Sequence, residues 1–172
     1  MKTVVLYESM FGNTRQVAEA IAEGLGESSY VEVCPIGAVS AMALAEVDIV
    51  VVGAPTHAHT LSTPASRADA KRQAANVDHH LTLEPDATGT GIREWIEAMQ
   101  PGSGAFAAFD TRTDIPRILS GAASARIDRE LRKRGMHAIV PPESFTVSRE
   151  NRLDPGERER AHQWGATIAH AQ

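Results

Sequence analysis

The sequence predicts an α/β protein: a single three-layer domain over residues 1–172, with a five-stranded parallel sheet and helices on both faces. Strand-like and helix-like segments alternate from end to end, and this alternation requires parallel strands joined by crossover helices. The length suits one full core and is too short for two ordinary domains. Five strands in a doubly wound sheet of this size fit the spatial order 2-1-3-4-5.

The first strand and the first helix have the clearest signals. Val4–Leu6 is an apolar run rich in β-branched residues, as in a strand buried on both faces. After a short polar turn, apolar side chains recur every four residues, which is typical of one face of an amphipathic helix. These side chains are Val17, Ile21 and Leu25.

The other elements follow from similar patterns. Further strands are predicted over residues 30–33, 48–53, 105–109 and 137–140. Further helices are predicted over residues 42–46, 63–75, 91–98, 121–134 and 154–169. Pro64 suits the first turn of its helix, and Asp154 with Glu157 has the pattern of a reciprocal cap for the last one. Residues 76–90 are polar and predict an exposed excursion, and residues 143–152 predict either an edge strand or an ordered loop.

Composition and charge exclude several classes of function. Apolar residues make up 42% and charged residues 23% of the chain, as in a globular protein in water. The formal charge of −5 argues against nucleic-acid binding, and no apolar run reaches membrane-spanning length. The first strand begins without a signal-peptide pattern, so we expect a cytoplasmic location; abundant arginine and alanine suggest a bacterial source. Cys34, the single cysteine, excludes an internal disulfide and is predicted to be a small apolar residue near a strand end.

The turn Ser9–Thr14, between the first strand and the first helix, has the layout of an anion-binding cradle. Backbone N–H groups and the positive end of a helix converge there, which suits a phosphate. Gly12 permits a positive φ and a close approach of the backbone to a ligand. Ser9, Asn13 and Thr14 can donate from their side chains, and Asn13 or Thr14 can cap the helix. The alternative is an ordinary strand-to-helix connection, because the same residue types occur in turns for purely local reasons.

The stretch Ser9-Met10-Phe11-Gly12-Asn13-Thr14 resembles the FMN phosphate loop of flavodoxins, which reads Ser/Thr-x-Thr-Gly-x-Thr; here Phe11 replaces a hydroxyl residue. The resemblance extends to a strand that ends in Gly-x-Pro-Thr-His at residues 53–57 and to a later Phe-Asp-Thr loop at residues 109–111. It implies a flavodoxin-like fold and FMN as the cofactor, with the flat ring held between the loops 53–60 and 110–114. The cofactor-binding residues that it implies are Ser9, Met10, Phe11, Gly12, Asn13, Thr14, Pro55, Thr56, His57, Ala58, His59, Asp110, Thr111 and Arg112.

The two ring-binding loops depart from those of the electron-carrier flavodoxins. Neither contains the tyrosine or tryptophan that the carriers place against the flavin, which leaves Met10, His57 and His59 as candidates to pack on the ring. Arg112 can neutralise a reduced, anionic flavin or form a surface ion pair. Asp110 can accept a hydrogen bond from the ring or cap the following turn. The two histidines have no third ligand nearby, so no metal site is predicted.

The resemblance implies an FMN-binding redox protein, active in electron transfer or in the NAD(P)H-dependent reduction of a small acceptor such as a quinone. The missing aromatic walls leave space above the ring, which favours the reductase over a carrier that docks a redox partner protein. The alternative is a flavin-free module that uses the flavodoxin fold for interaction or regulation, and both the missing stacking residues and Phe11 favour it. The sequence identifies no catalytic acid, base or nucleophile, and it does not determine the oligomeric state.

Overall fold

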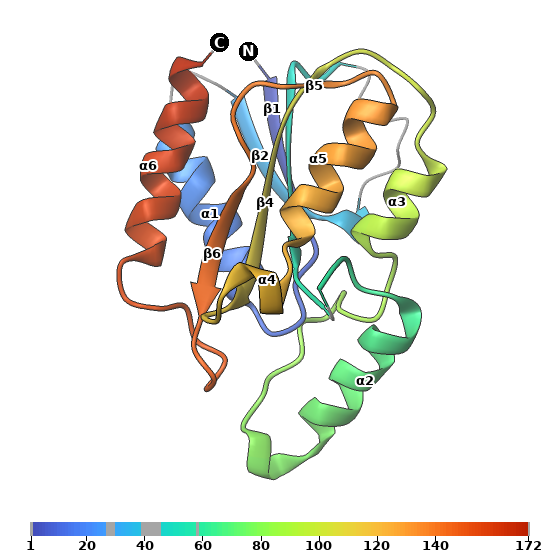
Figure 1. Cartoon of the computed structure of the whole chain (residues 1–172), viewed down its shortest axis with the longest axis vertical. Helices are drawn as coiled ribbons and strands as arrows, with labels where there is room; N and C mark the ends of the chain where they lie inside the picture. The colour runs from blue at the N-terminus through green and yellow to red at the C-terminus, as the bar shows by residue number, and fades with distance from the viewer. Residues whose placement is uncertain (1, 27–29, 39–45, 58, 172) are drawn as a thin grey trace.

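The computed structural model describes residues 2–26, 30–38, 46–57 and 59–171, which form one parallel β-sheet with helices on both faces (Figure 1). Within these residues the strand order is β2-β1-β3-β4-β5, and β6 also pairs with β4. The strands are β1 (Lys2–Tyr7), β2 (Tyr30–Pro35), β3 (Ile49–Pro55), β4 (Ala105–Thr113), β5 (His137–Ala138) and β6 (Glu143–Val147). The predicted α/β class and the order 2-1-3-4-5 are confirmed, and β6 is an additional strand.

Four of the described helices pack in two pairs on the two faces of the sheet. The described helices are α1 (Asn13–Leu25), η1 (Ile36–Ala38), α2 (Pro64–Ala75), η3 (Val77–His79), α3 (Ile92–Ala98), α4 (Arg117–Ser120), α5 (Ala123–Lys133) and α6 (Glu157–His170). One apolar core lies between the sheet and α3 with α5, and the other between the sheet and α1 with α6 (Figure 1). The helix predicted over residues 42–46 falls outside the described residues, apart from Glu46, which lies in a turn.

Strand β4 is longer than predicted. The strand expected to end at residue 109 continues to Thr113, so the prediction of a loop at residues 110–114 is wrong for residues 110–113. The physical reason is a partner distant in the sequence, because the C-terminal half of β4 pairs in parallel with Glu143–Val147. Hydrogen bonding to β6 therefore keeps this segment extended, although the apolar pattern of the strand ends at Phe109.

The last predicted strand, over residues 137–140, is interrupted. β5 covers only His137–Ala138, which pairs with the start of β4. Pro141 and Pro142 follow, and proline has no N–H to donate to a ladder. Pairing with β4 resumes in β6, so the segment 143–152 is a strand in its first half and a turn in its second.

The starts of α2 and α6 show one capping signal that predicts the structure and one that does not. α2 begins at Pro64 as predicted, and the Thr63 side chain caps it by accepting the N–H of Ser66 at 3.2 Å. α6 instead begins after Gly156, and its side-chain cap is absent in this part of the described chain. The Glu157 carboxylate accepts the N–H of Thr146 at 2.6 Å, and the N–H of Asp154, the expected capping partner, donates to the carbonyl oxygen of Thr146 at 3.1 Å.

The segment that follows α2 is only partly the exposed excursion that the sequence predicts. α2 and the start of this segment project beyond the carboxyl ends of the strands (Figure 1), and residues 76–80 are exposed. The later part packs back onto the protein, where Leu83 and the buried Ala87 join a small apolar cluster with Met10. The N–H of Glu84 also donates to the carbonyl oxygen of Met10 at 2.8 Å. The segment therefore covers the loop at the end of β1.

Helices α1 and α6 approach each other closely because a glycine on each faces the backbone of the other. A Cβ on Gly165 would overlap the carbonyl group of Ile21, and a Cβ on Gly24 would overlap that of His162. Next to this contact, Trp164 on α6 packs edge-on against Phe109 with a centroid distance of 6.3 Å. The pair of helices therefore forms a tight layer over one face of the sheet.

Candidate functional site

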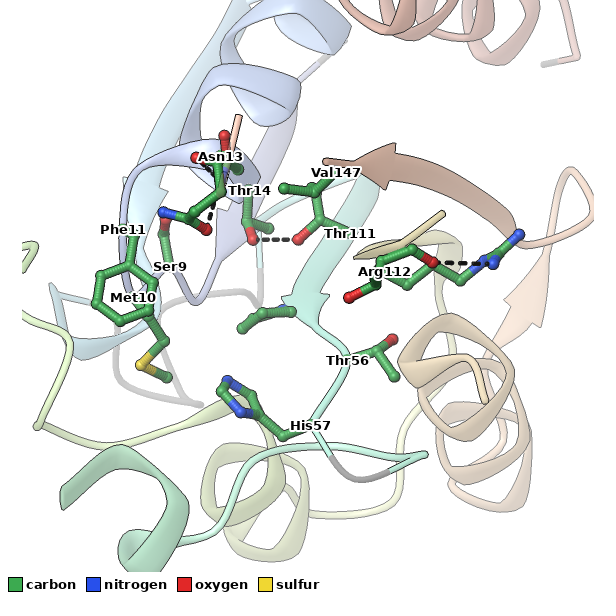
Figure 2. A pocket seen from close by; sticks show the side chains of 13 residues that line it. Ser9, Met10, Phe11, Asn13, Thr14, Thr56, His57, Thr111, Arg112 and Val147 are labelled. Carbon is green, nitrogen blue, oxygen red and sulfur yellow. Dashed lines mark hydrogen bonds between the residues drawn. The ribbon is translucent and has the colours of Figure 1, made fainter. Parts of the chain in front are cut away.

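A cleft lies at the carboxyl edge of the sheet, where the strand order reverses between β1 and β3. It joins the loop after β1, the end of β3 and the end of β4 (Figure 2). Its lining consists of Ser9, Met10, Phe11, Asn13, Thr14, Pro55, Thr56, His57, Thr111, Arg112, Thr113, Val147 and Asn151. Its volume of about 140 Å³ is below the roughly 300–1,000 Å³ of ordinary ligand pockets. The enclosed part of the cleft therefore suits a small group, such as a phosphate, better than a whole cofactor.

The Ser9–Thr14 loop turns sharply into α1. Gly12 has a φ of 92° and donates its N–H to Ser9 Oγ at 3.0 Å. Gly12 also occupies the N-cap position without a side-chain cap, so the prediction that Asn13 or Thr14 caps the helix is wrong. Both residues lie in the first turn, where N–H groups have no acceptor within the helix. The loop therefore combines free N–H groups with the positive end of a 13-residue helix.

Two side chains of this first turn bridge to distant segments. Thr14 Oγ1 shares a hydrogen bond of 2.8 Å with Thr111 Oγ1 on β4. Asn13 Nδ2 donates to the main-chain oxygen of Asn151 at 3.1 Å and to its Oδ1 at 3.0 Å. These contacts fix the loop against β4 and against the turn that follows β6.

Thr56 and Asp110 both cap the start of α5, whose own N-cap residue is an alanine. Thr56 Oγ1 accepts the N–H of Ala123 at 2.9 Å, and Asp110 Oδ2 accepts the N–H of Ser124 at 2.7 Å. Asp110 is fully buried and does not line the cleft. Burial raises the pKa of its carboxyl group, and the hydrogen bond from Ser124 opposes that rise. Of the two roles expected for Asp110, the contacts in the structure are those of a cap.

His57 forms part of the wall opposite the phosphate-type loop. Its backbone exchanges two hydrogen bonds with Thr60, at 2.8 and 2.9 Å, which closes a tight turn. Its Nε2 is buried and has no partner within the described residues. Burial, followed by the positive charge of Arg67, lowers the pKa of His57, so the imidazole is neutral at pH 7. His59 is exposed with a φ of 72° and is not part of the lining, and Ala58 lies outside the described residues.

Met10 and Phe11 occupy different depths of the cleft. Met10 is 3% exposed and packs against Ala70 and Ala87. Figure 2 shows its side chain extending from the loop toward His57. Phe11 is half-buried and lines the cleft at the same loop. Met10 therefore contributes an apolar wall, while Phe11 keeps part of its ring in contact with solvent.

Arg112 lies at the side of the cleft away from the Ser9–Thr14 loop (Figure 2). Its Nη1 donates to the carbonyl oxygen of Ile115 at 2.7 Å and to Ser120 Oγ at 3.2 Å. Its Nε is buried and has no partner among the residues described. The arginine therefore orders the chain after β4 while its buried Nε–H stays unused, and it forms no ion pair in this part of the structure.

A buried polar network lies directly behind the cleft and has no counterpart in the sequence analysis. Glu8, which follows β1, accepts hydrogen bonds from the Ser62 hydroxyl and from the N–H of Ile92. Arg67 donates to Ser62 Oγ at 2.9 Å and pairs with Glu94 at 3.0 Å. Burial raises the pKa of Glu8, and its hydrogen bonds and Arg67 oppose the rise. The network ties the end of β1 to the starts of α2 and α3.

Three lining residues are absent from the predicted cofactor-binding residues: Thr113, which belongs to the predicted ring-binding loop 110–114, Val147 and Asn151. Thr113 on β4 pairs with Val147 on β6, although 34 positions separate the two residues in the sequence. Asn151 reaches the cleft through the turn that follows β6. The alternate apolar residues Phe145 and Val147 indicated a strand, but they did not indicate that this strand would pair with β4.

Several other features of the described chain bear on function. No helix there has both the length and the apolar character needed to cross a membrane, and no three metal-ligating side chains form a group. Cys34 is buried at the end of β2, as expected of a small apolar residue. Burial, with a smaller effect of Glu32, raises the pKa of its thiol to about 11.

Residues 4–74 match the model of a family described as the Flavodoxin domain. Oxidised Flavodoxin 2 from Bacillus cereus has a similar structure, with a TM-score of 0.70, 16% identity and coverage of 100% of both chains. A Streptococcus pneumonia TIGR4 flavodoxin gives a TM-score of 0.69 at 16% identity, also over 100% of both chains. A flavodoxin, WrbA-like protein from Agrobacterium tumefaciens gives 0.58 at 21% identity, over 98% of this chain and 95% of that one. No curated protein sequence matches this chain.

Proposed function

We propose that the cleft of this flavodoxin-like fold binds FMN and that the bound flavin serves a redox reaction. The observation that carries the proposal is a convergence of segments. The Ser9–Thr14 loop, the end of β3 and the end of β4 line one cleft where the strand order reverses. Ligands of open α/β sheets bind at such switch points. In this proposal the loop holds the phosphate and the other two segments face the flavin ring.

The geometry of the loop fits a phosphate. A Cβ on Gly12 would lie 3.1 Å from Glu84 Oε1, and its φ of 92° disfavours any other residue, so the bare backbone can approach a ligand. Arg15 is held by Glu19 at 2.8 Å and by Glu84 at 3.2 Å. Binding would therefore depend on backbone N–H groups, on hydroxyl groups and on the helix end.

The ring side of the cleft offers two buried nitrogen atoms that lack partners within the described residues: His57 Nε2 and Arg112 Nε. A buried polar atom without a partner costs about 1–3 kcal/mol, so a ligand that pairs with it is stabilised. The neutral His57 can donate or accept, whereas Arg112 only donates and carries positive charge. FMN would supply the electron or hydride transfer, both residues would orient the ring, and the positive charge of Arg112 would favour its reduced, anionic form.

Between the two redox activities, we favour NAD(P)H-dependent reduction of a small acceptor, such as a quinone, over electron carriage. Phe11 and His57 are the aromatic side chains among the described lining residues, and tyrosine and tryptophan are absent from that lining. A reductase needs space above the ring for its donor and acceptor, and without tyrosine or tryptophan walls that face of the ring would stay uncovered. Steady-state oxidation of NADH or NADPH in the presence of a quinone measures this activity. Flavin-loaded protein that passes electrons only to a partner protein would support the carrier.

Titration with FMN and with riboflavin tests the choice of cofactor. We expect FMN to bind and riboflavin to bind at least about tenfold more weakly, because riboflavin lacks the phosphate that the loop would hold. Flavin fluorescence and calorimetry report the two dissociation constants. Absence of any fluorescence change or heat with either compound would refute the proposal. Equal affinity for both would show that the loop does not hold a phosphate.

A flavin-free role in interaction or regulation is the second candidate, and specific contacts favour it. The Thr14 and Thr111 hydroxyls already pair with each other, and the Asn13 amide already donates to Asn151. Phe11 also takes the place of a hydroxyl residue in the loop. These polar groups would have to exchange partners on binding a phosphate. Protein that remains colourless and unresponsive to flavins would support this second function.

A further inference from the structure

The turn that follows β6 brings Asn151 against the Ser9–Thr14 loop. Asn151 lines the cleft together with Asn13 and Thr14 of that loop. Although 138 positions separate the two asparagines, Asn13 Nδ2 donates to the main-chain oxygen of Asn151 at 3.1 Å and to its Oδ1 at 3.0 Å. Figure 2 shows Asn13 next to Thr14 at the loop end of the cleft. The turn after β6 is therefore part of the wall around the proposed phosphate position.

The contact commits the amide nitrogen of Asn13 to Asn151. Asn13 Nδ2 is the donor in both hydrogen bonds, and the two acceptors on Asn151 match the two hydrogens of an amide nitrogen. Asn13 is 7% exposed, so its side chain has little room to turn away. The other end of the Asn13 amide is a carbonyl oxygen, which accepts hydrogen bonds and cannot donate to a phosphate. While this contact persists, the Asn13 side chain is therefore not a phosphate donor.

The same contact orients Asn151 and leaves its own donor free. Asn151 Oδ1 accepts from Asn13, whereas Asn151 Nδ2 has no hydrogen-bond partner among the residues that the structure describes. The backbone is held as well, because the N–H of Asn151 donates to the carbonyl oxygen of Ser148 at 3.0 Å, and the N–H of Ser148 donates to that of Arg152 at 2.8 Å. The φ of Asn151 is 56°, in the left-handed region that asparagine tolerates. Asn151 therefore presents a fixed amide whose nitrogen is unused.

The Ser9–Thr14 loop itself is short of free side-chain donors. Phe11 stands where flavodoxin loops carry a hydroxyl residue, and the Thr14 hydroxyl is paired with that of Thr111. Arg15, the cation next to the loop, is held by two carboxylates at 2.8 and 3.2 Å. A neutral donor from outside the loop would form a charge-assisted hydrogen bond with a phosphate there.

We infer that Asn151 is a phosphate-binding residue of this site: its Nδ2 donates to a phosphate oxygen of FMN, while its Oδ1 keeps the hydrogen bond from Asn13. The inference rests on the proposed function and adds a donor from outside the Ser9–Thr14 loop. In number, this donor offsets the hydroxyl that is missing at Phe11. Asn13 is then a positioning residue, because it orients the Asn151 amide and does not itself touch the phosphate. The Asn13–Asn151 contact stays intact when the ligand binds.

The substitution Asn151→Asp tests the inference in the full chain. Aspartate also tolerates a positive φ and keeps an acceptor for Asn13, but a carboxylate oxygen replaces the donor nitrogen. We expect the affinity for FMN to fall at least about tenfold, because the donor is lost and the carboxylate repels the phosphate. Riboflavin, which has no phosphate, should bind within about twofold of its wild-type affinity. Calorimetric titration with FMN and with riboflavin gives both dissociation constants.

The matched control is Asn76→Asp, which adds the same charge away from the cleft. Asn76 is exposed and lines neither the cleft nor the Ser9–Thr14 loop, and aspartate keeps the acceptor for the N–H of Asp78. This variant should change neither affinity. Added salt should restore part of the FMN affinity of Asn151→Asp, because salt screens the repulsion between the carboxylate and the phosphate.

A second variant, Asn151→Gly, removes the amide without adding charge and suits the positive φ. Its affinity for FMN should fall by a smaller factor than that of Asn151→Asp, again with little change for riboflavin. If Asn151→Asp does not fold, this variant carries the same comparison. Far-UV circular dichroism of the flavin-free proteins checks their folding.

The outcomes separate the inference from the proposed function. FMN binding that neither variant weakens would overturn the inference and leave FMN as the cofactor. Equal losses for FMN and riboflavin would also overturn it, because Asn151 would then act on the fold of the loop and not on the phosphate. If the wild-type protein binds neither flavin, the proposed function fails and the inference fails with it.

Discussion

Thr14 on α1 and Thr111 on β4 share a hydrogen bond of 2.8 Å between their side-chain oxygens, although 97 positions separate them in the sequence. Both hydroxyls line the cleft, and both residues are buried. The bond connects the proposed phosphate loop to the segment on the proposed ring side. Rotation of the Thr14 hydroxyl toward a phosphate would exchange this bond for a charge-assisted one, which is stronger.

The substitution Thr14→Val keeps the shape of the side chain and removes its hydroxyl. We expect the affinity for FMN to fall about tenfold, because one hydrogen bond to a charged group is lost. Riboflavin binding should change little. The control is Thr167→Val, whose hydroxyl donates to the carbonyl oxygen of Gln163 on the surface of α6. Equal losses for FMN and riboflavin would mean that Thr14 acts on the fold of the site and not on the phosphate.

Arg67→Met removes the cation of the buried network behind the cleft. Arg67 has a side-chain exposure of 5% and pairs with Glu94 at 3.0 Å. Its loss leaves the buried Glu8 and the half-buried Glu94 without its positive charge, so the free energy of unfolding should fall by about 3 kcal/mol. Urea denaturation at pH 7 measures the change. Arg72→Met removes an exposed pair with Asp69 and should lower the free energy of unfolding far less than Arg67→Met does. Similar small effects for both variants would contradict a structural role of the network.

His57 should produce a pH dependence of stability with a definite sign. Burial lowers its pKa in the folded state below the ordinary 6.5, so the unfolded chain binds the proton more readily. The free energy of unfolding should therefore decrease as pH falls below about 6.5, until His57 is also protonated in the folded protein. His57→Gln should remove that part of the slope. Urea denaturation at pH 7.5 and pH 5.5 measures the difference, and NMR titration of the imidazole gives the pKa directly. An imidazole that titrates at or above 6.5 would contradict the burial argument.

Gly165→Ala should weaken the contact between α1 and α6. The new Cβ would overlap the Ile21 carbonyl group, and a backbone group cannot move aside as a flexible side chain can. We expect the free energy of unfolding to fall by about 1–3 kcal/mol, as for overpacked cores. Gly37→Ala is the matched control, because its Cβ would meet no atom within 4 Å and its φ is not positive. Thermal unfolding compares the two variants, and equal melting temperatures would contradict the close approach of the helices.

Much of the fold could be predicted because its signals are local. The apolar run Val4–Leu6 reports burial on both faces of a strand, and the spacing of Val17, Ile21 and Leu25 reports one face of a helix. The proline at position 64 and the threonine before it also specified the start of α2 correctly. Each signal needs only neighbouring residues, so none depends on how the chain packs.

Predictions failed where a distant segment changed a local preference. β4 extends past Phe109 because β6 pairs with it, and Glu157 turns from its own helix cap to the N–H of Thr146. For Asp110 the sequence left two roles open, and its contact with the N–H of Ser124 at the start of α5 is that of a cap. Among the site residues, the structure brings the loop, Pro55–His57 and Thr111 together, and it leaves His59 outside.

The sequence by itself determined the α/β class, the parallel strand order and the place of the phosphate-type loop after β1. These follow from apolar periodicity and turn residues, which act over a few positions of the chain. The tertiary structure alone decided which side chains face the cleft, how residues 81–87 cover its loop, and that Asn151 binds Asn13 beside it. Those features depend on contacts between segments far apart in the sequence. The free energy that stabilises these contacts comes from strand pairing and burial between distant segments, which no local sequence pattern specifies.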